Sequence, residues 1–430
     1  MNFLPNVIFA IVLFTGIGFF VRNIRKLKRN IYLGKDVDIS GDSNIRWKNM
    51  ALIALGQSKM VRRPISGILH IIVYIGFVII NIEVLEIIID GLVGTHRIMS
   101  GIGSLYGILI GTFEILASLV FVAVVIFWFR RNVIKIKRFL SSEMKGWPKL
   151  DGNLILYFEI VLMGLFIIMN ATDVEFQSMN SGNVISQYFA PMFEGHNVHL
   201  IERVAWWMHI VGILIFLNYL YYSKHLHILL AFPNTYYGNI NPKGQFNNLE
   251  AVTNEVKLMM DPNVDPFAAT DDEGSVPDKF GVSDVQDLNK IQLLNAYSCT
   301  ECGRCTSECP ANQTGKKLSP RKIMMDTRDR LVEVGNNIDA NNGEFIPDGK
   351  QLLGDYVTNE ELWACTSCNA CVEACPISID PLSIILEMRR YLVMEQSAAP
   401  MELNTMMSNI ENNGAPWPYN QMDRLNWKND

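Results

Sequence analysis

Two short cysteine-rich stretches decide the architecture of this chain. Residues 299–310 read CTECGRCTSECP, and residues 365–376 read CTSCNACVEACP. Each stretch has three cysteines separated by two residues, a fourth cysteine after three more residues, and then a proline. Together they contain all eight cysteines of the 430-residue protein. Soft thiolate ligands at such close spacing indicate an iron site.

The spacing C-x2-C-x2-C-x3-C-P is the signature of bacterial ferredoxins with two [4Fe–4S] clusters, in which the fourth cysteine binds the other cluster. Disulfides are disfavoured in a reducing cytoplasm, and zinc sites use pairs of cysteines rather than such quartets. We therefore predict two clusters. The first is expected on Cys299, Cys302, Cys305 and Cys375, and the second on Cys365, Cys368, Cys371 and Cys309.

The residues around these motifs carry helix signals. Ser319-Pro320 predicts a helix through Arg330, and Thr358 with Glu361 forms a capping box. We expect further helices from near Ser283 to Cys299 and from Pro381 to about Gln396. Residues 284–396 resemble the helical ferredoxin fold of heterodisulfide reductase C-type subunits and of the iron–sulfur subunit of succinate dehydrogenase.

The half of the chain before residue 232 holds nearly all the long apolar runs. Five runs are long enough to cross roughly 30 Å of hydrocarbon. Basic residues follow the first and third runs and precede the second and fourth, which predicts an external N-terminus and a cytoplasmic C-terminal half. The runs cover approximately residues 4–21, 66–92, 101–129, 153–171 and 199–222. An interfacial helix is expected over residues 46–63.

Histidines within or near these runs are candidate haem ligands. His70 begins the second run, His209 lies inside the fifth, and His227 follows it. In a continuous helix the 18 residues from His209 to His227 make five turns, so both rings would face one side about 27 Å apart. This suits two haems held by facing helices. The alternative for each histidine alone is a hydrogen bond to a neighbouring helix.

Residues 221–228, YYSKHLHI, resemble the end of the last span in the cytochrome b (gamma) subunit of respiratory nitrate reductase. Residues 67–70 and 76–77 resemble its second span, and the resemblance covers about residues 1–235. It implies a b-type haem on His70 and His227, and a second on His209. The family's second histidine of that span is replaced by Ile80.

The missing histidine leaves the outer haem without an obvious second ligand. We predict His96 as this ligand, with His196 and His199 as alternatives, and a one-haem protein stays open. Arg62 or Arg63 is a candidate partner for a haem propionate. The acidic residues in the spans either hydrogen-bond within the bundle or serve a quinone, and they predict no proton path by themselves; they are Glu83, Glu86, Glu114 and Glu159.

Two segments flank the cysteine domain. Residues 236–283 are expected to form a loosely structured linker. Residues 397–430 resemble the connector that precedes a cysteine-rich CCG domain in larger relatives, which implies that a CCG-type iron–sulfur subunit docks on this tail. A disordered tail is the alternative.

The sequence thus predicts an all-α protein of the inner (cytoplasmic) membrane: a five-helix transmembrane haem-binding bundle, N-out and C-in, plus a cytoplasmic α-helical ferredoxin domain. The net charge of −6 argues against nucleic acid as a partner. No GxGxxG fingerprint is present, so the expected role is that of an electron-transfer subunit of a membrane oxidoreductase, with substrate chemistry on a partner subunit.

The resemblance implies a flavoprotein partner, such as electron-transfer flavoprotein, and the quinone pool, with menaquinone as the quinone. Two alternatives remain open at this point. One is a subunit of a quinol-driven disulfide or sulfur-compound reductase. The other is a non-catalytic redox sensor or membrane anchor.

Overall fold

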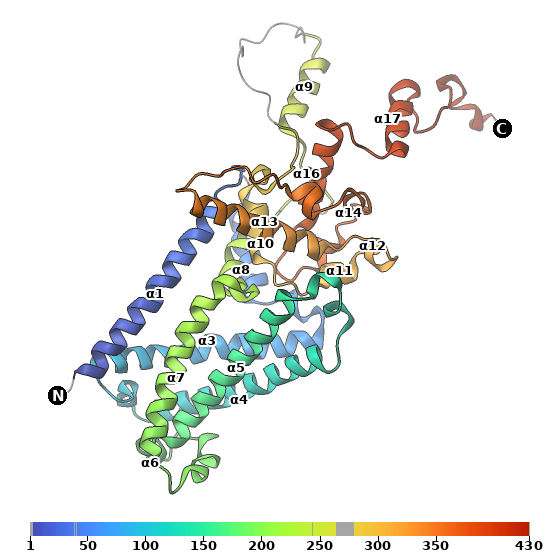
Figure 1. Ribbon diagram of the computed structural model, residues 1–430. Helices are drawn as coiled ribbons and strands as arrows, with labels where there is room; N and C mark the ends of the chain where they lie inside the picture. Colours follow the sequence, from blue (N-terminus) through green and yellow to red (C-terminus); the bar gives the residue numbers. More distant parts are fainter. Residues whose placement is uncertain (1–2, 38, 40, 243, 264–278, 430) are drawn as a thin grey trace.

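The computed structural model describes residues 3–37, 39, 41–242, 244–263 and 279–429. Within these ranges the chain is helical and contains no β-strand, only isolated bridges between Lys35 and Asn289 and between Leu353 and Val357. Figure 1 shows long helices in the lower part of the molecule and shorter helices above them. The all-α prediction agrees with this architecture.

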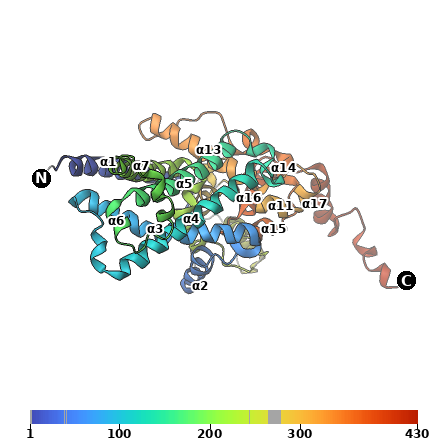
Figure 2. The same ribbon diagram turned by 90° about the horizontal axis from the view of Figure 1, so that it is seen from below.

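Five long helices form the lower part, and each is long and apolar enough to cross a membrane. They coincide with the five predicted runs and extend most of them by a few residues. Helix α3 packs on α4, α4 on α5, and α5 on α7, while α1 lies against α7 and α3 (Figure 2). Their bounds are α1 Leu4–Ile31, α3 Pro64–Val93, α4 Ser104–Asn132, α5 Trp147–Thr172 and α7 Val198–Tyr219.

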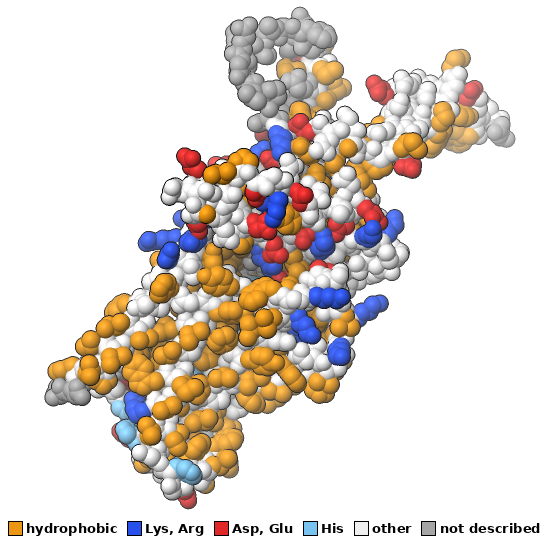
Figure 3. Space-filling model, viewed as in Figure 1, with side chains coloured by type: hydrophobic (Ala, Val, Ile, Leu, Met, Phe, Trp, Pro, Cys, Tyr) orange, Lys and Arg blue, Asp and Glu red, His pale blue; other side chains and the backbone are white. Residues whose placement is uncertain are grey.

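Apolar side chains cover the outside of this bundle as well as its inside. Phe113 and Phe166 are fully buried, whereas Phe14, Ile68 and Ile108 are each about 60% exposed or more. Figure 3 shows hydrophobic side chains over the lower part, with most charged side chains gathered above. Water-soluble proteins rarely expose so continuous an apolar surface, so the bundle is a membrane domain.

The predicted interfacial helix over residues 46–63 is interrupted. Helix α2 (Ser43–Asn49) runs into a π-helical turn, η1 (Met50–Leu55), and a 3-10 turn, η2 (Met60–Arg62), comes before α3. The break falls at Gln57, whose φ of 52° lies in the left-handed region.

The expected continuous helix from His209 to His227 is wrong. After α7 come two 3-10 turns, η8 (Leu220–Tyr222) and η9 (Lys224–Leu226), and then α8 (His227–Tyr236). Ser223 between the turns is extended, with φ −112° and ψ 147°. The Asp151 carboxylate accepts from the Lys224 N–H at 3.2 Å, and the Ser223 hydroxyl accepts from the His225 N–H at 3.1 Å. Side chains therefore satisfy the N–H groups that a continuous helix would have used.

The upper part is the cysteine domain. Two predicted helix starts are confirmed: Ser319 caps α13, which runs ten residues past Arg330, and Thr358 and Glu361 form the capping box of α14. The predicted helix from near Ser283 is wrong, because Leu288 and Asn289 are extended and α10 begins only at Lys290, where Asn289 caps it. The chain reaches Cys299 through η10 and α10. The elements are η10 Val285–Asp287, α10 Lys290–Ser298, α11 Arg304–Glu308, α12 Pro310–Gln313, α13 Pro320–Ala340, η11 Leu352–Tyr356, α14 Asn359–Trp363, α15 Ala370–Ala374 and α16 Pro381–Met394.

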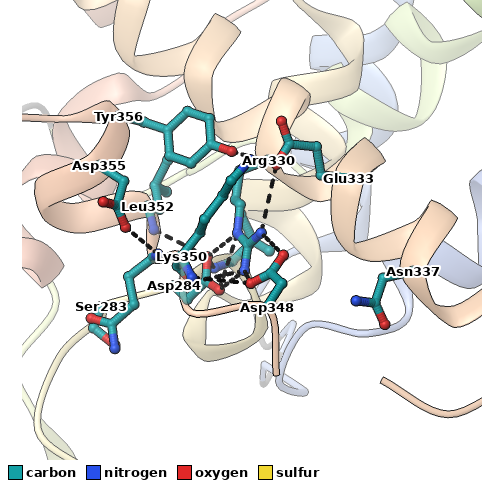
Figure 4. A network of polar contacts seen from close by, with 12 residues as sticks. Ser283, Asp284, Arg330, Glu333, Asn337, Asp348, Lys350, Leu352, Asp355 and Tyr356 are labelled. Atoms are coloured by element: carbon teal, nitrogen blue, oxygen red, sulfur yellow. Dashed lines mark hydrogen bonds and ion pairs between the residues drawn. The ribbon is translucent and has the colours of Figure 1, made fainter. Parts of the chain in front are cut away.

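A buried arginine anchors the long segment between the two motifs (Figure 4). The Arg330 side chain is fully buried, and its guanidinium donates to the carboxylates of Asp284 and Asp348, with nearest distances of 2.8 and 2.5 Å. It also donates to the carbonyl of Lys350 at 2.8 Å. Since Asp284 lies at the start of the domain and Asp348 in the segment between the motifs, Arg330 joins the two.

The predicted linker and tail contain helices where they are described. Helix α9 (Glu250–Met260) lies in the linker, whose residues 264–278 are outside the described ranges. In the tail, α17 (Met401–Asn413) is followed by two 3-10 turns, η12 (Gln421–Asp423) and η13 (Asn426–Lys428). The described part of the tail is therefore folded into local helices.

Candidate functional site

Helices α11 and α15 pack together and bring the two cysteine motifs face to face. The four cysteines predicted for the first cluster line one cavity, which Cys371 of the second set also touches. Its lining is Cys299, Thr300, Cys302, Gly303, Cys305, Arg321, Met324, Cys371, Cys375, Pro376, Ile377, Ile379 and Pro381. Cys375 thus joins the motif that lies 70 residues before it in the chain, as the crossed ligand pattern requires.

The second predicted set combines two buried cysteines, Cys309 and Cys371, with one exposed cysteine. Cys309, Cys365, Cys368 and Cys371 interact electrostatically with one another, and Cys368 is exposed. All eight cysteines are free of disulfides. Among the described residues, no three His, Cys, Asp or Glu side chains converge tightly enough to hold a single metal ion. Four thiols around one cavity fit a four-iron cubane, which takes four cysteine ligands.

Positive charge surrounds the first set. Burial raises the pKa of the Cys375 thiol to about 11 and that of Cys299 to about 12, so metal binding has to displace their protons. The guanidinium groups of Arg304 and Arg138 act electrostatically on Cys302. Cationic groups at this position favour the negative charge of a thiolate-bound cluster.

The first motif rests directly on one end of the bundle, which we call the proximal end. Arg304 donates to the carbonyls of Lys59 and Met60 at 3.1 and 3.2 Å. Glu301, between two of the cysteines, forms ion pairs with Lys224 and, at 2.8 Å, with Arg328. The Lys224 and Glu301 side chains are 9% and 2% exposed, so this contact is buried.

Arg62 and Arg63, candidates for a haem propionate, are paired with acidic residues of the cysteine domain. Arg62 lies 2.6 Å from Glu373, and Arg63 lies 2.8 Å from Glu308. These two arginines therefore fasten the cysteine domain to the proximal end.

His70 and His227 meet at the proximal end. Their ring centres are 6.3 Å apart, and the ring planes are inclined by 42°. The Nδ1 of His227 faces the Lys224 carbonyl at 3.2 Å, so Nδ1 carries the proton and Nε2 is left as the lone-pair donor. Burial lowers the pKa of His227, which keeps the ring neutral. The Nδ1 of His70 is buried without a hydrogen-bond partner in the part of the chain that is described.

His209 is buried inside the bundle with 2% exposure. Its Nδ1 lies 3.1 Å from the Leu162 carbonyl, and its ring lies 6.1 Å from that of Phe166. A carbonyl only accepts, so Nδ1 donates to it, which again leaves Nε2 as the lone-pair donor.

His96 lies elsewhere, between two carboxylates. Its Nε2 is 3.2 Å from Asp173 and its Nδ1 is 3.2 Å from Glu175. The hydrogen bond to Asp173 raises the pKa of His96. Over the described ranges we find no contact between His96 and His209, so their pairing stays a prediction. His199 lines the same surface pocket as His96, and the Nδ1 of His196 lies 3.3 Å from the Glu194 carbonyl.

The bundle end away from the cysteine domain, which we call the distal end, contains a polar network that sequence reasoning missed. Arg97, 7% exposed, donates to Asp173 at 2.7 Å, to Asn170 at 2.8 Å and to the Tyr106 hydroxyl at 3.2 Å. Tyr106 donates to Glu86 at 3.1 Å. The signal available in the sequence was an arginine in a short loop beside spans that carry carboxylates.

Five membrane-type helices joined to crossed cysteine quartets define a membrane protein with an iron–sulfur domain. Residues 298–379 match the 4Fe-4S dicluster domain family. The chain is 27% identical to the probable iron-sulfur-binding oxidoreductase FadF of Bacillus subtilis, across 98% of this chain and 60% of that protein. It is 26% identical to the EtfAB:quinone oxidoreductase of Syntrophomonas wolfei, across 87% of this chain and 53% of that protein.

A third relative matches a shorter part of this chain with higher identity. One subunit of the ferredoxin/F(420)H(2)-dependent CoB-CoM heterodisulfide reductase of Methanosarcina acetivorans is 35% identical over 114 residues, which are 26% of this chain and 56% of that relative. The chain therefore spans little more than half the length of the curated relatives that it matches. No solved structure matches it.

Proposed function

We propose that this chain is the membrane electron-transfer subunit of a quinone-linked oxidoreductase. It carries electrons between a cytoplasmic redox partner and the membrane quinone pool, through two [4Fe–4S] clusters and b-type haem. The observation that carries the proposal is the direct seating of the first cysteine set on the bundle end that holds His70 and His227. The chain crosses the inner membrane with its N-terminus outside and its cysteine domain in the cytoplasm.

One exposed cysteine and the contacts of the first motif give the order of the carriers. Cys368 is exposed, so the second cluster faces the soluble partner. Glu301 and Arg304, which lie between cysteines of the first motif, contact the bundle, so the first cluster faces the membrane. Electrons from a partner pass through the second cluster, then the first, and then enter the bundle.

The His70 and His227 pair fits a haem iron. An iron–nitrogen bond of roughly 2 Å on each side, plus roughly 1 Å from nitrogen to ring centre, places the ring centres of a bis-histidine haem roughly 6 Å apart. The observed separation is 6.3 Å. A haem bound here supplies a one-electron carrier, and the chain's own part is to hold two neutral imidazoles from separate elements in opposition.

A second haem on His209 extends the same path toward the distal end. His209 has the backbone hydrogen bond that orients a ligating imidazole, with Nε2 as the lone-pair donor. We keep the sequence-based prediction that His96 is the second ligand of this haem.

The relatives suggest the partner. One of them is described as an EtfAB:quinone oxidoreductase and another as an iron-sulfur-binding oxidoreductase, and each matches most of this chain. We infer that the partner is an electron-transfer flavoprotein, with a CCG-type iron–sulfur module between flavin and clusters, and that menaquinone is the quinone.

Reconstitution tests the proposal. The purified chain should contain about eight iron atoms and b-type haem, and with its partner it should reduce a menaquinone analogue at the expense of reduced flavoprotein. Protein without porphyrin absorption and without iron would remove the basis of the assignment.

A quinol-driven disulfide reductase is the second candidate, because 114 residues of this chain are 35% identical to a subunit of a heterodisulfide reductase. This function would run electrons from quinol through the bundle to the clusters. Cluster reduction by a menaquinol analogue that requires a disulfide substrate for turnover, with no response to flavoprotein, would favour it.

A further inference from the structure

Three acidic side chains share one face of α3 near the distal end. Glu83, Glu86 and Asp90 are spaced by three and four residues, which places them in a row along the helix. Asp90 is half-buried at the end of the row, while Glu83 and Glu86 are each 3% exposed. Carboxyl groups at this depth in a membrane helix are costly, and they persist mainly where they serve a function.

Glu86 and Asp90 are held by fixed partners. The two Glu86 oxygens accept from the Met99 N–H at 2.9 Å and from the Tyr106 hydroxyl at 3.1 Å. Asp90 accepts from the N–H groups of Arg97 and Ile98 at 2.7 and 3.1 Å, and from Thr95. The outer two members of the row are thus held by the loop after α3 and by Tyr106 of α4.

Glu83, the innermost member, is different. Its Oε2 atom is buried and has no hydrogen-bond partner in the described part of the chain. An unpartnered buried carboxyl oxygen is expensive unless something else uses it. Glu83 lies one helical turn from Glu86, with Cβ atoms of such a pair roughly 5–6 Å apart, a gap that side-chain rotation can cross.

One arginine and several carboxyl groups surround the side chains of the row. The charged groups acting on Glu83 are Arg97, Glu86 and Glu114, and those acting on Glu86 include Arg97 and Asp90. Helix α1 also packs on α3, but its segment from Leu4 to Val21 contains no titratable side chain. Arg97 is therefore the cation that balances the row.

From this row we propose that Asp90, Glu86 and Glu83 form a proton route between the distal aqueous phase and a quinone in the bundle, with Arg97 and Tyr106 as positioning residues. The inference rests on the proposed function. Reduction of one quinone to quinol consumes two electrons, supplied by the reduced partner through the clusters, and two protons. Glu83 gives a proton to a quinone oxygen and regains one from Glu86, which is recharged through Asp90. Quinol oxidation uses the same route in reverse.

The test compares Glu83→Gln with Glu159→Gln in full-length protein reconstituted in vesicles with a menaquinone analogue. Glu159 is a matched control, because it is also a buried glutamate of the bundle but lies on α5, outside the acidic row of α3. Stopped-flow absorbance follows haem oxidation by the quinone across a pH series. Haem content, iron content and the rate of haem reduction by dithionite are measured in parallel.

Glu83→Gln should slow quinone-linked haem oxidation about 100-fold, the usual contribution of a positioned acid, and flatten its pH profile. Haem content and dithionite reduction should be unchanged, Glu159→Gln should stay within about 2-fold of wild type, and Glu83→Asp should restore part of the rate. A Glu83→Gln rate equal to wild type, or an equal loss in Glu159→Gln, overturns the route.

Tyr106→Phe keeps the route testable if Glu83→Gln fails to fold. It removes the hydroxyl that links Arg97 to Glu86, and it should slow the same step about 10-fold with normal haem content. An unchanged rate in Tyr106→Phe counts against the route. Absence of quinone turnover in wild-type protein instead contradicts the proposed function itself.

Discussion

The cysteine domain and the membrane bundle assemble their redox sites in opposite ways. In the cysteine domain, three of four predicted ligands of each cluster lie within seven consecutive residues, and only one comes from the other motif. In the bundle, each candidate haem ligand is a single histidine on its own element, and packing brings His70 and His227 together. A site encoded locally can be identified from sequence spacing, whereas a site made by packing depends on the whole fold.

The two regions also manage buried charge differently. The cysteine domain pairs its buried charges directly, as Arg330 does with Asp284 and Asp348. The bundle pairs Arg97 with Asp173 in the same way, but it also keeps Glu83 with an unpartnered oxygen, within the described residues, inside a membrane helix. Paired charge stabilises a scaffold, while an unpaired carboxyl in a span indicates a functional group.

The largest effect should come from replacing a cysteine of the first cluster, most of whose ligands lie close together in the sequence. Cys305→Ser should remove the first cluster, lowering iron from about eight to about four atoms per chain, because the remaining three thiolates cannot complete the cubane. Iron determination and EPR of the reduced protein measure this. Ser307→Ala in the same helix, α11, is the control, and an unchanged iron content in Cys305→Ser would contradict the ligand assignment.

The site that helix packing forms from His70 and His227 should lose its haem when one of the two histidines is replaced. His227→Ala should abolish the proximal haem, since a neutral imidazole opposite His70 is lost, while any haem on His209 is retained. A pyridine haemochrome assay gives the haem per chain. His225→Ala is the matched control, because His225 is half-buried like His227 and its ring lies 5.3 Å from that of His227. Equal haem loss in both variants would show that the region, rather than the ligand, had been disturbed.

The scaffold of the cysteine domain should depend on its buried arginine. Arg330→Met leaves Asp284 and Asp348 without their partner and should lower the free energy of unfolding by about 3–5 kcal/mol. Denaturant unfolding followed by cluster absorbance measures the change. Lys350→Met, in the same network but at its exposed edge, should produce no measurable change. Similar losses in both variants would refute the special role of the buried site.

The smallest effect on stability should come from the ion pair of Lys224 and Glu301, which joins the bundle to the cysteine domain. Lys224→Met leaves Glu301 with Arg328 as a remaining partner, so we expect a loss of about 1–3 kcal/mol in thermal unfolding of the whole chain. Adding Glu301→Met should recover part of this loss, since an apolar pair avoids the desolvation penalty. A double variant that is less stable than the single one would show that the ion pair itself is net stabilising.

Sequence patterns predicted the fold well where local rules dominate. The five apolar runs, the Ser319 cap and the Thr358 capping box all appear in the structure, because burial length and end-group hydrogen bonds act over a few residues. The prediction from helical periodicity failed at Ser223, because the Asp151 carboxylate of α5 accepts a hydrogen bond from the Lys224 N–H. No pattern within residues 209–227 reveals a partner on a different helix.

The sequence by itself determined the spans and the two cysteine quartets, since each depends on the spacing of neighbouring residues, and the crossed ligand pattern stays a prediction. Only the tertiary structure decided that His70 faces His227, that Arg62 and Arg63 pair with the cysteine domain, and that His96 lies between two carboxylates. These contacts join residues far apart in the chain, and their geometry is set by how the helices pack rather than by any local preference of the backbone.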